Sequence, residues 1–317
     1  MRIGIAVDSH GRASSPQRPT PDWESIKDQA LTAEAVGFDA VFVPDHLIYP
    51  SENGNTGCWE SVSLAAGLAA VTTTIEIGHS MFNAPYRSPA LVAKIAETLD
   101  EISGGRYILG IGAGNTPDSD YAAFGFEADK RYSRFAEAIE IIHGLLKNGR
   151  VDFEGKYWSA RNADLVLRGP RPQGPPIVIA AWGPKMMHLT ARFADVWNGW
   201  VPVEKGPSIE TFRPMVDELE RACQEVGKDP ATLRRSLDIQ VDPLSLHDEG
   251  EKPITGTSEE IAEAILVFRD IGIDEVRCYP YWPMPEKPGD RRKMIESMAE
   301  IVDLVHAGNE IQFISKD

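Results

Sequence analysis

The chain has 317 residues, a formal net charge of −16 and a hydrophobic fraction of 42%. This length admits one large α/β barrel or two smaller domains, and the composition is that of an ordinary soluble globular protein. The negative charge argues against nucleic acids and anionic membranes as partners, because both require a basic surface. No apolar stretch approaches the ~20 residues needed to span a bilayer.

The N-terminus and the cysteines indicate a cytoplasmic protein. The opening residues, MRIGIAVDSH, become polar too soon for a secretory signal. Cys58, Cys223 and Cys278 stand far apart, without the spacing of a metal site or an even number for a disulfide framework. We therefore expect free thiols in a reducing compartment.

Apolar runs alternate with helical periodicity along the first part of the chain. Strands are expected over residues 2–8 and 40–43. A helix over 23–37 separates them and stops at a glycine, and a second helix follows over about 59–70.

Residues 75–115 are typical of a complete strand, crossover helix and parallel strand. The apolar run 106–111 fits a strand buried on both faces, and the helix before it is expected over 88–104. Ligands of parallel α/β folds bind at the carboxyl ends of the strands. The segments 79–87 and 112–118 are therefore expected to carry the chemistry.

The second half continues the alternation after two irregular insertions. The polar and aromatic loop after Gly114 has a length that is most often functional, and 149–176 is interpreted as a short hairpin and a proline-rich connector. A helix over 132–147 separates the insertions. Later strands are expected over 177–181, 194–198, 237–241 and 275–279, and later helices over 185–193, 209–226, 257–269 and 291–306.

Eight strands thus alternate with eight helices, without a composition break that would mark a domain boundary. This pattern predicts a single α/β domain over 1–317, a (β/α)8 TIM barrel with insertions after strand 4 and before strand 5. A doubly wound sheet is the alternative.

The glycines at 110, 112 and 114 invite comparison with the dinucleotide motif G-x-G-x-x-G. The spacing fails, because Asn115 and Pro117 stand where the last glycine would be required. The glycines are interpreted instead as allowing close approach of the backbone to a flat ring, with tight barrel packing as the alternative.

Several segments match one family in order and spacing. They are AEAVGFDAVFVPDH (33–46), APYRSPALVAKIAETLDEISGGRYILGIGAG (84–114), AAFGFEADKRYSRFAEAIEII (122–142), AAWGPKMMHLTARFADVWNGW (180–200) and, more weakly, 256–279. With them the chain resembles the bacterial luciferase-like flavin- and deazaflavin-dependent oxidoreductases. The resemblance implies a TIM barrel that binds FMN or F420 at the carboxyl ends of its strands, in a protein that is a homodimer.

His46 is the first catalytic candidate. Histidine exchanges protons near neutral pH, and His46 stands at the end of a strand directly after Asp45. The resemblance implies that this histidine lies over the cofactor ring as an acid or base, with Asp45 beside the cofactor. A structural, hydrogen-bonded histidine is the alternative.

The resemblance also implies the cofactor contacts. Ser80 and Met81 lie where family members carry a bulge, often with a cis peptide, behind the ring, with an ordinary strand end as the alternative. Further cofactor contacts are expected from Asn83 and from Gly112, Ala113 and Gly114.

The segment Ala181, Trp182 and Gly183 precedes a helix, where free N–H groups can bind the cofactor's phosphate. The Gly183 and Lys185 amides can serve, whereas Pro184 has no N–H. Trp182 could instead form a packing contact or a substrate wall.

The predicted function is that of an oxidoreductase using FMN or F420, either a monooxygenase or a hydride-transfer enzyme, on a small organic substrate. A non-catalytic flavin-binding protein and a cofactor-free barrel lyase or isomerase are the alternatives.

Asn115 stands where some F420-dependent dehydrogenases carry an acidic residue, which argues against a sugar-phosphate substrate. No metal motif, nucleophile elbow or P-loop is present. Apolar walls of the substrate cavity could come from Trp59, Trp200, Tyr279, Tyr281 and Trp282.

Overall fold

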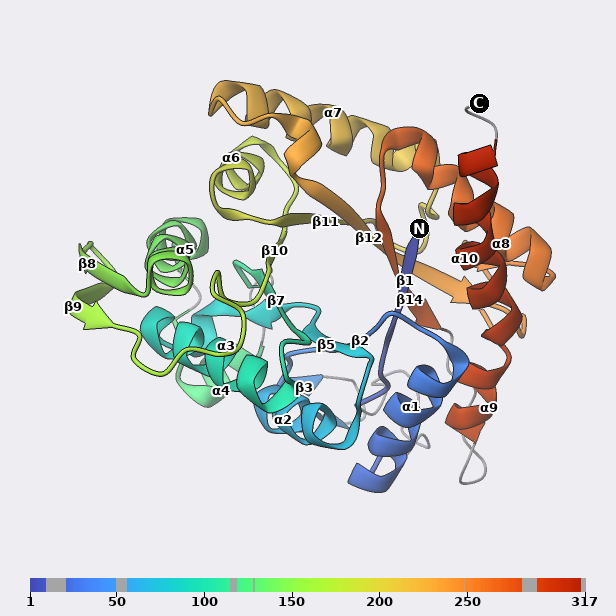
Figure 1. Cartoon of the computed structure of the whole chain (residues 1–317), viewed down its shortest axis with the longest axis horizontal. Coiled ribbons are helices and arrows are strands. Elements are labelled where there is room, and N and C mark those ends of the chain that lie inside the picture. Colours follow the sequence, from blue (N-terminus) through green and yellow to red (C-terminus); the bar gives the residue numbers. More distant parts are fainter. Residues whose placement is uncertain are drawn as a thin grey trace.

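The computed structural model describes residues 1–9, 21–49, 56–114, 119–127, 129–247, 249–280 and 290–314. At its centre is a ring of parallel strands, with helices around the outside (Figure 1). The barrel strands are β1 (Arg2–Ala6), β2 (Ala40–Val43), β5 (Glu76–His79), β7 (Tyr107–Gly112), β10 (Ile177–Ala180), β11 (Val196–Trp200), β12 (Arg234–Asp242) and β14 (Glu275–Pro280). The ring closes because β7 pairs with β5 on one side and β10 on the other. This closed ring confirms the predicted (β/α)8 barrel.

Helices connect successive strands and cover the outer face of the ring (Figure 1). Their apolar sides pack on the outward residues of the strands in one continuous core. They are α1 (Trp23–Val36), α2 (Ser61–Val71), α3 (Pro89–Ser103), α5 (Arg131–Asn148), α6 (Pro184–Phe193), α7 (Ile209–Glu225), α8 (Ser258–Leu266), α9 (Asp290–Glu296) and α10 (Ala299–Ile314).

Two helix ends show how local sequence sets the boundaries. α3 ends at Gly104, whose φ of 65° lies in the left-handed region that glycine adopts readily. At the start of α8, the Thr257 hydroxyl accepts from the Glu260 N–H at 3.3 Å, and the Glu260 carboxylate accepts from the Thr257 N–H at 2.8 Å. Such a reciprocal pair satisfies two N–H groups that a helix start leaves without partners.

Two predicted helices have different boundaries in the structure. The one expected over 291–306 is two helices, α9 and α10, because the Ser297 hydroxyl donates to the Met294 carbonyl at 2.7 Å and competes with helical hydrogen bonding. The helix expected over 257–269 is shorter in the structure. Its α-helical part, α8, ends at Leu266, and a 3₁₀ helix (Val267–Ile271) follows directly.

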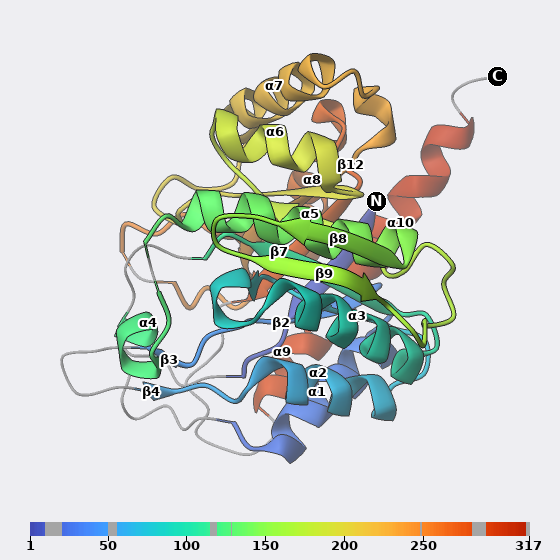
Figure 2. The same cartoon turned by 90° about the vertical axis from the view of Figure 1, so that its left-hand side faces the viewer.

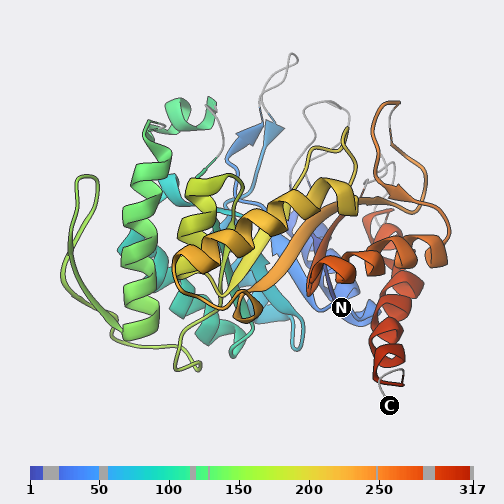
Figure 3. The ribbon, with the colours of Figure 1, turned by 90° about the horizontal axis from the view of Figure 1, so that it is seen from above.

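Short elements that were not predicted lie near the carboxyl ends of the strands. β3 (Ile48–Tyr49) pairs antiparallel with β4 (Thr56–Gly57) after β2, and α4 (Ser119–Phe124) lies in the loop after β7. Figure 3 shows these elements gathered at the same end of the molecule. They extend the end of the barrel at which the strands terminate.

The predicted hairpin between β7 and β10 is confirmed. It consists of β8 (Arg150–Glu154) and β9 (Ser159–Asp164) and lies beside α5 (Figure 2). The Glu137 carboxylate of α5 fixes its turn by accepting the N–H groups of residues 156–158 at 2.8 to 2.9 Å.

One aromatic ring fills the barrel interior. Alternate residues of a strand face opposite sides, so Phe42 points into the barrel while Val41 packs against the helices. Gly4 and Gly78 leave room for the ring, because a Cβ at either position would lie 2.6 or 2.7 Å from a Phe42 atom. Arg277 lies over the same ring, with Cζ 4.2 Å from its centroid. The interior is therefore packed and not open through the barrel.

None of the helices in the described part of the chain combines the length and apolar character needed to cross a membrane. Cys58, Cys223 and Cys278 are free cysteines. Burial raises the pKa of the thiols of Cys223 and Cys278.

Candidate active site

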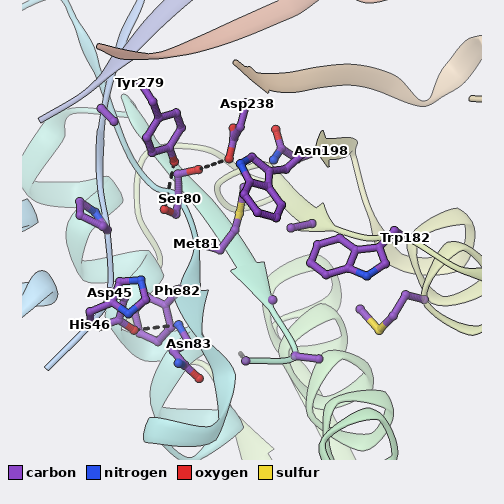
Figure 4. Close-up of a pocket in the computed structure, with 18 of the residues that line it drawn as sticks. Asp45, His46, Ser80, Met81, Phe82, Asn83, Trp182, Asn198, Asp238 and Tyr279 are labelled. Atoms are coloured by element: carbon purple, nitrogen blue, oxygen red, sulfur yellow. Dashed lines mark hydrogen bonds between the residues drawn. The ribbon is translucent and has the colours of Figure 1, made fainter. Parts of the chain in front are cut away.

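A pocket of about 650 Å³ lies at the carboxyl ends of the barrel strands (Figure 4). Its walls come from the ends of β1, β2, β7, β10, β11, β12 and β14, and from the segment that follows β5. This is the end at which TIM barrels bind ligands, and the volume is in the range of small-molecule sites.

The pocket brings together most of the residues that the sequence singled out. The predicted residues that line it are Asp45, His46, Ser80, Met81, Asn83, Gly112, Ala113, Gly114 and Trp182. Ala181 and Gly183 do not line it. Ala181 is buried, with its carbonyl accepting from Trp197 Nε1 at 2.9 Å, and Gly183 caps the start of α6.

Asp45 is buried and stabilises the pocket wall that contains Asn83. Its carboxylate accepts the Asn83 N–H at 2.7 Å and the Ser61 hydroxyl at 2.6 Å, and it forms an ion pair with Arg87 at 2.7 Å. Asn83 belongs to β6 (Phe82–Asn83), which pairs with the end of β7. Asp45 thus ties the end of β2 to this wall.

Ser80 and Met81 form the part of the wall beside the small residues at the end of β7. The peptide bond between them is cis. The Ser80 hydroxyl donates to Asp238 Oδ2 at 3.3 Å, and its carbonyl accepts from the Tyr279 hydroxyl at 3.3 Å. Figure 4 shows these contacts converging on Ser80 from β12 and β14. The segment is therefore fixed by side chains from the far side of the barrel.

Asp238 is a buried carboxyl group in the pocket. Burial raises its pKa to about 6, although Arg277, Asn198 and neighbouring hydroxyl groups favour its charged form. Perturbed carboxyl groups in clefts are characteristic of functional sites. Asp238 was not among the site residues predicted from the sequence.

Two histidines lie near the pocket in different environments. His46 lines the pocket and is half-buried. His79 is fully buried behind Phe82, with its ring 5.0 Å from the phenyl ring and Nδ1 2.8 Å from the Tyr107 hydroxyl. Burial lowers the pKa of His79 to about 4, so this imidazole is neutral at pH 7. Among the described residues His46 is thus the histidine placed to exchange protons with a ligand.

The three glycines of β7 and the turn after it have different reasons for being glycine. A Cβ at Gly110 would lie 2.0 Å from the His79 carbonyl oxygen, and one at Gly114 would lie 2.2 Å from the Tyr121 hydroxyl. These two positions are explained by close packing. A Cβ at Gly112 would lie 3.7 Å from Met81 Cβ, which is an ordinary contact distance. Packing therefore does not require glycine at this position, and the missing side chain leaves space in the pocket.

The mouth of the pocket carries aromatic and basic groups. Trp182 is 60% exposed, and its ring centroid lies 6.4 Å from that of Trp200. Arg131, at the start of α5, lines the pocket and donates to the Gly114 carbonyl at 2.9 Å. Arg131 is a cation in the pocket of a strongly acidic chain, and the sequence analysis had not singled it out.

The expected aromatic residues separate into two groups. Trp200 and Tyr279 line the pocket, whereas Trp59 does not and donates to the Pro21 carbonyl at 2.7 Å. Tyr281, Trp282 and Asn115 lie outside the described residues.

Asn198 also lines the pocket. A polar side chain inside an apolar strand is the sequence feature that could have indicated this. On β11, Asn198 is a polar residue inside an otherwise apolar strand, whereas Asp238 lies among several other polar residues of β12. In the described part of the chain, no group of three His, Cys, Asp or Glu residues could hold a metal ion.

The fold and pocket define a TIM barrel that binds a small molecule at the carboxyl ends of its strands. Residues 1–243 match the model of the luciferase-like monooxygenase family, and the chain belongs to this family, as the sequence predicted.

Among curated proteins, the chain is similar to 5,10-methylenetetrahydromethanopterin reductase of Archaeoglobus fulgidus, with 37% identity over 177 residues, or 56% of this chain. That match spans about half of the reductase, 49% of its length. The F420-dependent glucose-6-phosphate dehydrogenase of Kineococcus radiotolerans is 30% identical over 268 residues, covering 80% of this chain and 77% of the dehydrogenase.

Solved structures share the fold at low identity. An F420-dependent secondary alcohol dehydrogenase in complex with an F420-acetone adduct superposes with a TM-score of 0.77 at 18% identity, covering 96% of this chain and 98% of that one. The EDTA monooxygenase of Chelativorans sp. BNC1 has a TM-score of 0.77 at 16% identity, covering 96% and 93%.

Proposed function

We propose that the protein is an F420-dependent oxidoreductase that transfers a hydride between the deazaflavin and a small organic substrate. The predicted class, an oxidoreductase that uses FMN or F420, agrees with the family match and with the named activities of the curated relatives. The choice of F420 is supported by similar proteins that are named as F420-dependent dehydrogenases. We also propose one barrel domain over 1–317, a cytoplasmic location and a homodimer.

The observation that carries the proposal is the preorganised wall over residues 80–83. Three side chains from different strand ends hold it: Asp45 binds the Asn83 N–H, while Asp238 and Tyr279 bind Ser80. A wall fixed in this way can support a flat ring without rearranging, and preorganisation is what improves binding. The small residues Gly112 and Ala113 leave space in the pocket beside this wall.

The residues present fit such a ring system. The pocket is large enough for a drug-sized ligand, and its surface is more apolar than polar. Bound F420 would supply a ring carbon that accepts or donates hydride. Within this arrangement His46 exchanges the substrate's proton, and Asp45 positions the wall through Asn83 and not through direct contact of its own carboxylate.

The anionic part of the cofactor is proposed to lie toward Arg131 and the start of α6. The first N–H groups of a helix have no partner within the helix and can bind an anion. Pro184 is the first residue of α6 and has no N–H, so the N–H groups of the residues after it would serve. Trp182 and Gly183 shape the approach to it. The guanidinium of Arg131 adds positive charge at the pocket.

An FMN-dependent monooxygenase is the second candidate, because the matching family is described by that activity. Dioxygen distinguishes the two, since a reduced flavin reacts with oxygen and the deazaflavin does not activate it. An F420 enzyme should turn over equally fast with and without air.

The test is a titration of the purified protein with FMN and with F420, followed by fluorescence quenching. We expect tighter binding of F420, and oxidation of a secondary alcohol or reduction of a carbonyl compound under anaerobic conditions. Asn115 predicts no turnover of glucose 6-phosphate. Preferred binding of FMN, with oxygen-dependent turnover, would establish the monooxygenase instead, and binding of neither would overturn both.

A further inference from the structure

One wall of the pocket carries two buried polar atoms of opposite kind. Asn198 and Asp238 both line the pocket. Within the described residues, neither Asn198 Nδ2, a donor, nor Asp238 Oδ1, an acceptor, has a hydrogen-bond partner. Buried polar groups are nearly always paired, so an unpaired donor and acceptor on a pocket wall indicate a ligand that pairs with both.

The strand register places the two side chains together. β11 and β12 are parallel neighbours, with Asn198 opposite Ser236 and Trp200 opposite Asp238. Asn198 and Asp238 are therefore diagonal neighbours on the same face of the sheet, and Figure 4 shows them side by side.

Hydrogen bonds fix which atoms remain available. The Asn198 Oδ1 atom accepts from the Ser236 hydroxyl at 2.8 Å, which leaves the Nδ2 group as the available donor. The Asp238 Oδ2 atom accepts from the Ser80 hydroxyl at 3.3 Å, which leaves Oδ1. The pair therefore presents one N–H donor beside one carboxylate acceptor.

The charge around Asp238 limits what can bind. Burial raises its pKa to about 6, so the group is mostly a carboxylate at pH 7, with Arg277 and the hydroxyl groups of Ser80 and Tyr279 favouring that form. A phosphate or carboxylate ligand would be repelled by Asp238, and an apolar ring would leave both polar atoms unpaired. A neutral ring edge with an N–H beside a carbonyl satisfies both.

We propose that Asn198 and Asp238 recognise the cyclic amide edge of the cofactor's pyrimidinedione ring. Asn198 Nδ2 donates to a ring carbonyl, and Asp238 Oδ1 accepts the neighbouring ring N–H. This inference rests on the proposed function. Because FMN and F420 share this edge, the pair selects the ring type and does not distinguish the two cofactors.

The test compares FMN with N3-methyl-FMN, in which a methyl group replaces the ring N–H. In the unchanged protein, methylation should weaken binding about 10-fold or more, since it removes a hydrogen bond to a charged acceptor. In Asp238→Ala, FMN should bind more weakly and the methylation penalty should disappear. Asn198→Leu should weaken both ligands about equally and keep the penalty.

Two further variants control for structural damage. Asp238→Asn retains an acceptor oxygen and the shape of the side chain, and should keep part of the penalty. Gln240→Leu removes another buried acceptor atom on β12 that has no hydrogen-bond partner among the described residues and does not line the pocket, and it should leave both affinities unchanged. A general loss of folding would weaken both ligands alike and would not abolish the difference between them.

The outcomes separate this inference from the proposed function. Equal affinity of the unchanged protein for FMN and its N3-methyl derivative, or a penalty that persists in Asp238→Ala, overturns the inference while F420-dependent catalysis stands. If the Asn198 and Asp238 variants raise only the KM of the organic substrate, the two side chains bind the substrate and not the cofactor ring, and the inference is overturned. If F420 binds and FMN does not, F420 and N3-methyl-F420 replace FMN and N3-methyl-FMN with the same expected outcomes. Binding of neither FMN nor F420 refutes the proposed function itself.

Discussion

Asp45 and Arg87 form a buried two-point ion pair behind the pocket wall. Arg87 Nη1 lies 2.7 Å from Asp45 Oδ2, and Nη2 lies 3.2 Å from Oδ1. Such bidentate pairs fix geometry as well as charge. Because Asp45 also binds the Asn83 N–H, this ion pair connects the end of β2 with the segment that is proposed to support the cofactor ring.

Removing the carboxylate should damage both stability and binding. Asp45→Ala leaves the 12%-exposed Arg87 side chain with the more exposed Glu60 as its remaining carboxylate partner, at 2.6 Å. Breaking a buried pair from one side typically costs about 3–5 kcal/mol. Urea unfolding should show a loss of that order, and the affinity for F420 should fall as well.

Glu60→Gln is the matched control for the ion pair. Glu60 binds the same guanidinium from a more exposed position, where a pair contributes about 0–1 kcal/mol. Its side chain also accepts from the Ser63 N–H at the start of α2, and the amide oxygen of Gln can keep that hydrogen bond. Equal losses of unfolding free energy in Asp45→Ala and Glu60→Gln would show that the buried pair does not organise this wall.

The Phe42 ring should make Gly78 intolerant of a side chain. A Cβ at Gly78 would lie 2.7 Å from Phe42 Cε1, inside any normal contact distance, so Gly78→Ala should lower the free energy of unfolding by roughly 1–3 kcal/mol. A smaller side chain in Phe42→Leu should partly restore stability in the double variant. Gly57→Ala, where no atom of the described residues lies within 4 Å of the new Cβ, should have almost no effect.

The barrel could be predicted because the strands carry strong local signals. The expected strand over 40–43 matches β2, and 275–279 differs from β14 by one residue. Apolar runs of this length between helical periodicities leave few other arrangements. The break between α9 and α10 could not be predicted, because it depends on one hydroxyl, Ser297, that competes with the helix.

The site was predicted only where it follows a recognisable motif. Asp45, His46 and Ser80 stand directly at strand ends, and they line the pocket. Asn198 and Asp238 lie inside two different strands, and the sequence alone shows neither the register that brings them together nor which face of each strand points into the barrel. Closure of the ring decides this, and closure is a property of all eight strands together.

His46→Ala should separate catalysis from binding. If His46 exchanges the substrate proton, kcat should fall roughly 10²- to 10⁴-fold, while the Kd for F420 stays within a few-fold. His143→Ala is the control, because His143 packs against Phe193 outside the pocket and should leave kcat unchanged. A His46→Ala enzyme with unchanged kcat would remove this residue from the mechanism.

Asp238 should make stability depend on pH in a defined direction. Its pKa in the folded protein is about 6, against an ordinary 3.8, because burial disfavours the charged form. Below about pH 4 the group is protonated in both folded and unfolded chains, and its contribution to stability is fully present. That contribution is lost as the pH rises through about 6, because the folded protein must then hold a buried charge.

Asp238→Asn carries no titrating group, so it should gain stability relative to the unchanged protein between about pH 4 and pH 7. Two pKa units correspond to about 3 kcal/mol, which sets the order of magnitude. Urea unfolding of both proteins at these two pH values measures the change in their difference, in which the other titrating groups cancel. Glu204→Gln, at an exposed position, should show a difference that hardly varies with pH. A pH-independent difference for Asp238→Asn would mean that this carboxyl group keeps its ordinary pKa in the folded protein.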